Sequence, residues 1–327
     1  MRRALTKGIL FPSLGMALFF WLISPVLGKP LVIEKGVVQG DTIWEKEVVI
    51  RGDVEIARCA TLTIMPGTVV KFVKIEANGP DNLYVEDKMQ HFPRAELIIR
   101  GKILAQGTKD KMILFTSAEQ SPHVADWGAI NLLDSKNNIL EYCEISYGHT
   151  SVHGHGGQVA VVNCYLHDNG VSIGHKTVKE FETKGTMTIL YNRVTGNGGG
   201  VLCGKDSITM ISHNQISDNN FFGIYGKNAL SAYVRYNNIV HNGKGIILWI
   251  TQGFRISENN IADNKKYNIA LMEGQTWDLG VHHNWWGTTD EKKIKGLMWD
   301  RDEDETLGRI DFSGFAVSPI EGAGIPW

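Results

Sequence analysis

Residues 208–246 read ITMISHNQISDNNFFGIYGKNALSAYVRYNNIVHNGKGI and contain one motif twice. An aliphatic residue is followed three positions later by Asn and five positions later by Ile, as in Ile211, Asn214 and Ile216. The motif recurs from residue 140 to residue 286, with Cys in place of Asn in the first two copies, and its last apolar positions are 21, 28, 22, 23, 22 and 25 residues apart. This period is typical of a solenoid, whose interior is filled with side chains and whose function lies on outer faces and in loops.

The segments between the motifs favour strands over helices. They read TGNGG, SDNNFF, VHNGK and ADNKKY, which are turn-forming sequences, and an apolar residue resumes after each of them. Leucine-rich repeats have a similar period but need more Leu and a helical segment. The sequence therefore predicts an all-β protein, a right-handed parallel β-helix, with strict repeats over residues 139–287. We expect an N-terminal cap and first coils at 29–75, the β-helix at 76–287 with a loop at 76–95, and a C-terminal cap at 288–327.

The first 28 residues have the features of a signal peptide. Arg2, Arg3 and Lys7 precede a largely apolar stretch, and small residues end it at Gly28. An uncleaved anchor helix is the alternative, although Pro12 interrupts the apolar run. We expect an exported protein, periplasmic or extracellular, with no membrane span after signal cleavage.

The charge balance argues against nucleic acid as a partner. Loss of the three basic residues in 1–28 moves the net charge from −2 to −2 − 3 = −5, and no basic stripe remains. The sequence does not define an oligomeric state.

Two cysteines occupy the same position in adjacent copies of the motif, Cys143 and Cys164. Neighbouring strands lie about 4.8 Å apart, which is compatible with a disulfide. Two stacked, buried thiols satisfy the same spacing.

Asparagines form two columns in the predicted coils. One column contains Asn192, Asn214, Asn237, Asn259 and Asn284, and the other contains Asn169, Asn197, Asn219, Asn242 and Asn264. We interpret them as structural, because stacked amides at a bend can bond to one another and to unpaired backbone groups.

Several segments resemble the bacterial right-handed parallel β-helix repeat proteins of the pectate-lyase-like superfamily. They are ATLTIMPGTVVKF (60–72), ILFTSA (113–118), DWGAI (126–130), ILEYCEISYG (139–148), NWWGTTD (284–290) and LGRIDF (307–312). The resemblance implies the fold but not one activity, since the superfamily includes polysaccharide lyases, hydrolases, epimerases, adhesins and the periplasmic accessory protein of nitrous-oxide reductase maturation.

Histidines give one candidate site. Five of the eleven fall in a short span: His149, His153, His155, His167 and His175. His153 and His155 would point to one side of an extended strand, and a third His would complete a transition-metal site. Two apparent insertions, 147–157 and 174–185, are expected to meet beside these residues. A solvated Gly-rich loop with unpaired histidines is the alternative. The sequence requires no cofactor, and Ca, Zn or Cu is the candidate divalent metal.

Aromatic residues give a second candidate site. Tyr142, Tyr191, His213 and Tyr236 each precede the first Asn column or its Cys equivalent, so they could form an outward strip that stacks on sugar rings. Alternatively, these rings only cover the bend.

Acidic residues give weaker candidates. Asp168, Asp218 and Asp263 share one column but lie two coils apart, roughly 10 Å, which is too far for one calcium ion and typical of turn residues. The turn at 300–305 alternates Asp as a calcium loop does, but Glu305 replaces the required Gly.

These observations favour an exported carbohydrate-associated or surface interaction module that binds a polysaccharide or cell-surface glycan. A polysaccharide lyase or hydrolase is one alternative, although no acid cluster with a matching base can be found in the sequence. A periplasmic metal-handling accessory protein is the other.

Overall fold

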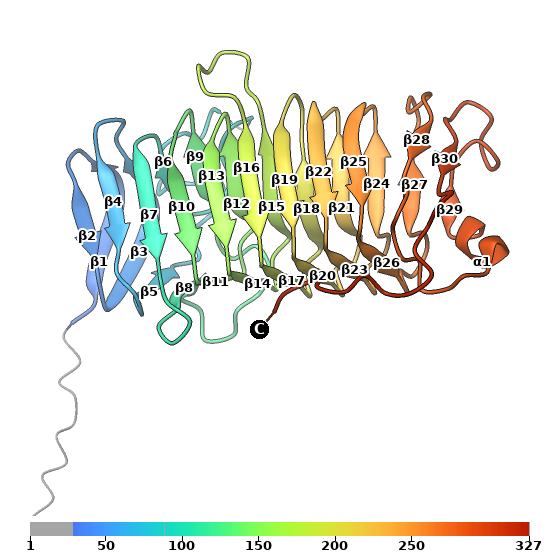
Figure 1. The fold of residues 1–327 in the computed structure, drawn as a ribbon. Helices are drawn as coiled ribbons and strands as arrows, with labels where there is room; N and C mark the ends of the chain where they lie inside the picture. The colour runs from blue at the N-terminus through green and yellow to red at the C-terminus, as the bar shows by residue number, and fades with distance from the viewer. Residues whose placement is uncertain (1–28, 88, 327) are drawn as a thin grey trace, which may run out of the picture.

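The computed structural model of the protein describes residues 29–87 and 89–326, so the predicted signal peptide lies outside the described residues. The chain winds into a parallel β-helix whose coils stack from β1 and β2 at one end to β28–β30 at the other (Figure 1). The strands form sheets of 19, nine and two strands. The predicted right-handed parallel β-helix is confirmed.

The nine-stranded sheet forms the front of the molecule in Figure 1. Its strands are β2 (Thr42–Trp44), β4 (Thr61–Ile64), β7 (Lys102–Gln106), β10 (Asn138–Glu141), β13 (Gln158–Val162), β16 (Thr186–Leu190), β19 (Ile208–Ser212), β22 (Ser231–Arg235) and β25 (Gly253–Ser257).

The 19-stranded sheet bends around the bottom and the back of the molecule (Figure 1). Two long strands run through both the bottom and the back of this sheet. They are β1 (Leu31–Val38) and β3 (Glu47–Ile56). The bottom strands are β5 (Val69–Phe72), β8 (Ile113–Ser117), β11 (Cys143–Ser146), β14 (Tyr165–His167), β17 (Arg193–Thr195), β20 (Gln215–Ser217), β23 (Asn238–Val240) and β26 (Asn260–Ala262). The back strands are β6 (Leu97–Ile99), β9 (Ile130–Leu133), β12 (Thr150–His155), β15 (Val171–Lys176), β18 (Gly199–Cys203), β21 (Phe222–Lys227), β24 (Ile246–Trp249), β27 (Ile269–Leu271) and β29 (Met298–Trp299).

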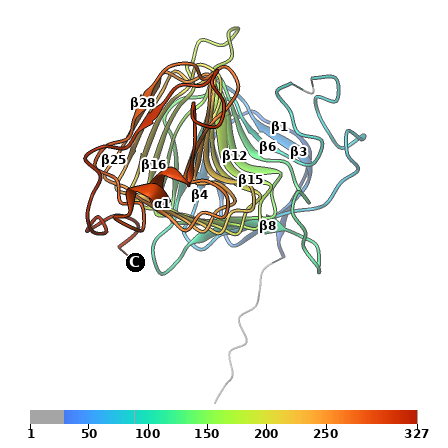
Figure 2. The same ribbon diagram turned by 90° about the vertical axis from the view of Figure 1, so that its right-hand side faces the viewer.

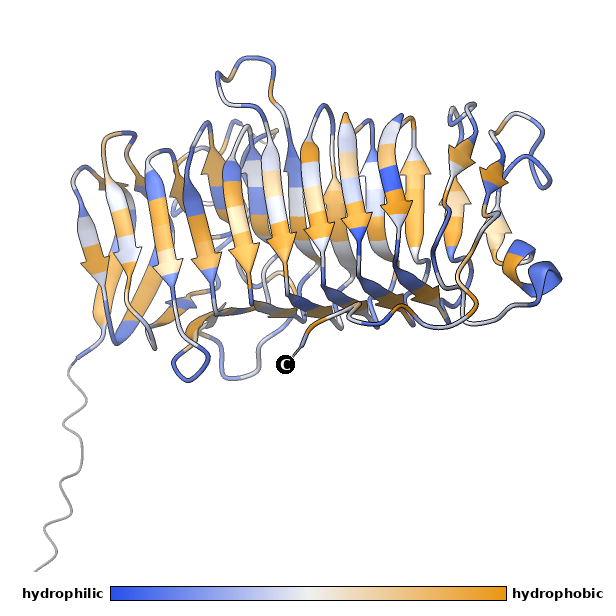
Figure 3. Cartoon of the chain, viewed as in Figure 1, coloured by the Kyte–Doolittle hydropathy of each residue, from blue (hydrophilic) through white to orange (hydrophobic). Residues whose placement is uncertain are grey.

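Aliphatic residues in register fill the interior. On the back sheet Ile173 pairs with Val201, and the same column continues through Ile224, Ile246 and Ile269, all fully buried. Figure 3 shows hydrophobic residues recurring on every front strand. Because each buried aliphatic side chain contributes about 1.5–3 kcal/mol, the repeat is the main source of stability.

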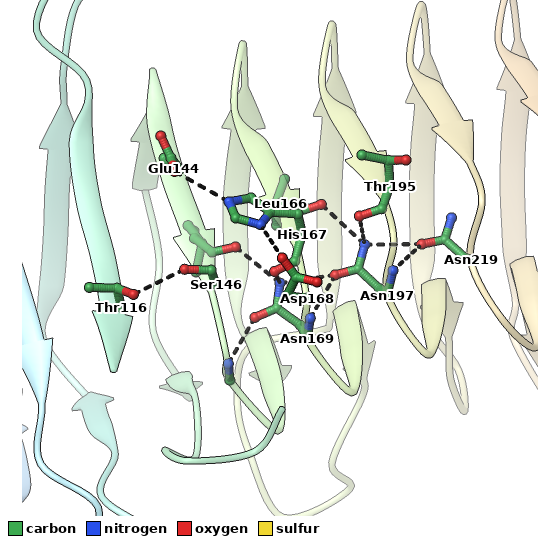
Figure 4. A network of polar contacts seen from close by, with 12 residues as sticks. Thr116, Glu144, Ser146, Leu166, His167, Asp168, Asn169, Thr195, Asn197 and Asn219 are labelled. Carbon is green, nitrogen blue, oxygen red and sulfur yellow. Dashed lines mark hydrogen bonds and ion pairs between the residues drawn. The ribbon is translucent and has the colours of Figure 1, made fainter. Parts of the chain in front are cut away.

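Asparagine ladders fix the bends on either side of the bottom sheet in the later coils. The Asn214 side chain donates from Nδ2 to the Ile189 carbonyl at 2.9 Å and to Asn237 Oδ1 at 2.9 Å, and the Asn237 Oδ1 also accepts the Asn214 N–H. Figure 4 shows the second ladder, where Asn169 bonds to Asn197 and Asn197 to Asn219. The structural interpretation of both columns is confirmed.

The residue before each ladder position has a left-handed backbone. φ is 57° at Tyr191 and 54° at Tyr236 in one column, and 53° at Asp168 and 57° at Asp218 in the other. Gly, Asn and Asp adopt this region most easily. The Asp column therefore follows from backbone geometry and needs no catalytic explanation.

Cys143 and Cys164 are free, buried thiols stacked at the first bend. The Cys143 N–H points at Cys164 Sγ, 3.4 Å away, which is the bond that an Asn side chain makes in later coils. Cysteine thus stands in for asparagine at these two positions.

The C-terminal segment closes the last coil and then returns along the bottom sheet. Helix α1 (Glu291–Lys295) and strand β29 cover the end of the stack, and β28 (Leu279–Gly280) pairs with β30 (Ile310–Asp311). Beyond β30, the Ile320 N–H donates to Asn260 Oδ1 at 2.7 Å and the Gly324 N–H to the Tyr236 carbonyl at 2.8 Å. The chain itself therefore covers part of the outer bottom surface (Figure 1).

Candidate functional site

Residues 76–87 and 89–95, which we call the cover segment, lie over the outer back surface of the first coils. They stand out from the side of the stack near β1, β3 and β6 (Figure 2). Asp53 of β3 anchors them, because its carboxylate accepts the Leu83 N–H at 2.6 Å and the Glu96 N–H at 3.0 Å. Tyr84 adds a second anchor through its hydroxyl, which donates to Glu55 at 2.6 Å.

Glu96 lies fully buried beneath the cover segment. Its Oε1 accepts the Phe92 N–H at 2.7 Å and lies 3.3 Å from His91 Nδ1, and its Oε2 accepts from Asn131 Nδ2 at 2.5 Å. Burial raises the pKa of Glu96 to about 7, although the neighbouring His91 imidazole opposes this shift. A buried carboxyl group that titrates near neutrality marks this part of the molecule as a candidate site.

His153 and His155 lie beside this carboxyl group on the outer side of β12. The register places His153 next to Asn131 and His155 next to Leu133, so both side chains point to the same side of the strand, as the sequence predicts. Their ring centroids are 4.4 Å apart, and Phe92 of the cover segment contacts His153 with a centroid distance of 5.2 Å.

Both imidazoles are held neutral. Burial, with smaller contributions from neighbouring positive charge, lowers the pKa of His153 well below its usual value and that of His155 to about 3. The Nδ1 atom of each ring is buried and has no hydrogen-bond partner among the described residues. A neutral imidazole with a free nitrogen is the form that binds a transition metal.

The other three predicted histidine ligands lie elsewhere: one at the rim of the site, one in the interior and one on the bottom sheet. His149 is exposed at the rim of the site and contacts Phe92 at 5.2 Å. His175 pairs with Gly154, so it points into the interior, where its Nε2 lies 2.8 Å from Thr209 Oγ1. His167 belongs to bottom strand β14 and lies between Glu144 and Asp168, at 3.3 and 2.7 Å (Figure 4).

The five histidines therefore do not form one site. Among residues 29–87 and 89–326, no three His, Cys, Asp or Glu side chains come together in an arrangement that could hold a metal ion. Segment 147–157 is also not an insertion, because it contains β12, which pairs with β9 and β15 like any other back strand. Segment 174–185 does meet it, since Phe181 packs near Gly156.

Sequence reasoning missed Glu96, His91 and Phe92. The cover segment has no periodicity, so nothing in the repeat indicates which coil it covers. The available signal was its length, because a long loop that interrupts a regular solenoid often carries function.

The predicted aromatic strip forms a row, but its rings contact one another. The His213 ring lies 5.0 Å from Tyr191 and 5.1 Å from Tyr236, centroid to centroid. Stacking along the row occupies ring faces that a sugar would need. Tyr142 precedes the same ladder, at φ 47°. A cavity of about 230 Å³ beside Tyr236 is also bounded by His213, Tyr233 and Arg235.

In the acidic turn at 300–305, a lysine ammonium group already pairs with the carboxylates. Asp300 is fully buried, and Lys295 Nζ lies 2.7 Å from Asp300 and 2.9 Å from Asp302. The lysine ammonium thus takes the place that a calcium ion would need.

None of the described helices is long and apolar enough to cross a membrane.

The solved structures that this chain is similar to are distant in sequence. The periplasmic alginate epimerase AlgG is 12% identical with a TM-score of 0.35, and the match covers 77% of this chain and 69% of that one. The A-module of the mannuronan C-5 epimerase AlgE6 from Azotobacter vinelandii is 13% identical with a TM-score of 0.39, covering 89% and 91%. No curated protein sequence matches this chain significantly.

A family model described as NosD, periplasmic copper-binding protein, matches residues 116–286. This match spans more than half of the chain and covers the strict repeats up to residue 286. Because the family is periplasmic, the match supports the predicted export. The chain belongs to the NosD family of parallel β-helix proteins.

Proposed function

We propose that this protein handles copper in the periplasm and takes the ion as cargo at His153 and His155. The observation that carries the proposal is the pair of neutral, adjacent imidazoles, each with a buried Nδ1 that has no hydrogen-bond partner among the described residues. The description of the family as copper-binding supports the choice of metal.

The donor set distinguishes between the candidate metals. Calcium takes six to eight oxygen ligands, and structural zinc takes four N, S or O ligands, whereas this pair supplies two nitrogens. Imidazole suits copper, and cuprous ion accepts two or three ligands. His149 at the exposed rim contacts the same Phe92 ring as His153, so it is our candidate for a third ligand or a point of entry.

Copper titration against a chromophoric Cu(I) chelator tests the proposal. The background should carry Cys59→Ser, because Cys59 is an exposed free thiol that would bind Cu(I) by itself. We expect one Cu(I) per chain, and at least tenfold weaker binding after His153→Ala/His155→Ala. His241→Ala/His283→Ala, which removes two exposed histidines elsewhere, is the matched control.

Two outcomes would overturn the copper proposal. One is unchanged binding in the His153/His155 variant, and the other is an equal loss in the control. Circular dichroism and thermal unfolding of each variant show whether lost binding reflects lost structure.

A carbohydrate-associated role is the second candidate. The 230 Å³ cavity beside Tyr236 has aromatic walls and a guanidinium group, which suits a single sugar ring better than a long polymer. A glycan array tests this role, and binding that survives Tyr233→Ala/Tyr236→Ala would exclude this cavity.

A further inference from the structure

The last coils carry a distinct surface on the outer side of β18, β21, β24 and β27, which we call the lysine–aromatic face. Its central column runs in register from Leu202 through Tyr225, Ile247 and Ala270 to Trp299. Phe222 and Tyr267 flank this column on one side, with Phe222 5.5 Å from Tyr225 and Tyr267 5.4 Å from Trp299 between ring centroids. Ile247 and Ala270 are only 7% and 2% exposed, so the accessible part of the face consists of Leu202 and the partly exposed aromatic rings around them.

Lysines surround these rings and are not neutralised. Lys227 Nζ lies 4.7 Å from the ring centre of Trp249, and Lys266 Nζ lies 5.3 Å from that of Tyr267. Lys244 lines a cavity of about 200 Å³ with Lys266, Tyr267 and Trp299. None of the three lysines forms an ion pair with a described carboxylate.

Acidic residues are missing from the same strands. β15, β18, β21, β24 and β27 contain no Asp or Glu. The same sheet has Asp53 and Glu55 on β3 in its first coils, so the fold does not exclude acids from the back surface. This surface has an apolar centre and, at its edge, lysines that form no ion pair with a described carboxylate. It is therefore complementary to a ligand that carries both apolar side chains and negative charge.

Three kinds of ligand can be compared for this face: a sugar polymer, a second copy of the chain and the surface of another protein. A sugar polymer needs hydrogen-bond partners for its hydroxyl groups, but the central column offers Leu, Ile, Ala and Trp and only one hydroxyl, on Tyr225. A second copy would bring lysines against lysines, which repel. A protein surface with apolar side chains among carboxylates meets both requirements. Phe221 and Met272, 70% and 37% exposed, extend the apolar area at its edges.

We infer that the lysine–aromatic face is a docking surface for an acidic protein partner with exposed apolar side chains. This inference is independent of the copper site, which lies beneath the cover segment on earlier coils.

An 18-residue peptide of alternating Glu and Leu or Phe is a suitable probe, with binding followed by Trp fluorescence of the full mature chain. We expect saturable binding that weakens as salt rises. Lys227→Glu/Lys244→Glu/Lys266→Glu should weaken it at least tenfold. Lys109→Glu/Lys111→Glu/Lys136→Glu, with the same change of charge on exposed residues of the early coils, should leave it unchanged.

A Tyr225→Ala/Trp299→Ala variant separates apolar contact from charge, and it should weaken binding while the salt dependence persists. The inference is overturned if the peptide does not bind, if polyglutamate binds equally well, or if both lysine variants lose binding equally. Tighter binding of polygalacturonate would assign the face to an acidic polysaccharide, and a dimer in sedimentation equilibrium that dissociates in the Lys227 variant would assign it to a second copy.

Discussion

The outer back surface is covered over the first coils and bare over the last, although one sheet forms both halves. In the covered half, Asp53, Glu55 and Glu96 bind the cover segment, and two neutral imidazoles lie beside them. In the bare half, aromatic rings and unpaired lysines occupy equivalent outward positions. A solenoid constrains its inward residues by packing and leaves its outward residues free. The outward residues therefore differ between the two halves because each half contacts something different, and not because the fold requires it.

Loss of the Asp53 anchor should have the largest effect on the covered half. Asp53→Ala leaves the buried N–H of Glu96 and the part-buried N–H of Leu83 unpaired, so we expect a loss of about 2–4 kcal/mol in the free energy of unfolding. Urea unfolding measures the loss, and limited proteolysis should begin within residues 76–95. Asp110→Ala, on an exposed turn with an ordinary backbone, is the control and should cost less than about 1 kcal/mol. Equal losses in the two variants would show that the cover segment is not anchored in this way.

The neutral histidine pair should make the covered half sensitive to acid. Burial lowers the pKa of His155 to about 3, so between pH 6.5 and 3 the unfolded chain binds a proton that the folded chain does not. Stability therefore falls as pH falls through this window, by about 2 kcal/mol at pH 5 from His155 alone. Urea unfolding at pH 7.5 and 5.0 should show a smaller difference in His155→Gln than in the unsubstituted protein. His241→Gln, an exposed control, should leave the difference unchanged.

Glu96 should produce an effect of similar size and opposite sign. Its pKa is raised to about 7, so between pH 4.5 and 7 the folded chain holds a proton that the unfolded chain has released. Stability then falls as pH rises through this window. Glu96→Gln should flatten the dependence between pH 5 and 8 by about 2 kcal/mol, because the glutamine amide does not titrate in this range. An unaltered slope would mean that another group titrates there.

The bare half should tolerate substitution best. Lys227→Glu/Lys244→Glu breaks no ion pair with a described carboxylate and removes one cation–π contact, so we expect a change in unfolding free energy of less than ~1 kcal/mol per substitution. Thermal unfolding measures it. A larger loss would indicate that these lysines stabilise the fold and do not serve a partner.

Much of the fold could be predicted from the sequence, and much less of the site. The column of Ile173, Val201 and Ile224 repeats because stacked strands require the same packing in each coil. The cover segment has no such repeat. Neither its place over His153 nor the burial of Glu96 could be predicted, because both depend on contacts between residues far apart in the sequence.

The histidines illustrate which features the sequence predicts and which depend on the tertiary structure. The two-residue period of a strand is enough to place His153 and His155 on one side of it. Whether that side faces outward, and whether His175 on the next coil faces inward, depends on the pairing of Val152 with Ile173. The sequence by itself determined the β-helix, its asparagine ladders and the shared direction of the histidine pair, since these follow from local periodicity. Only the tertiary structure decided which half of the back sheet is covered and which residues lose contact with water, because burial depends on what the rest of the chain places above them.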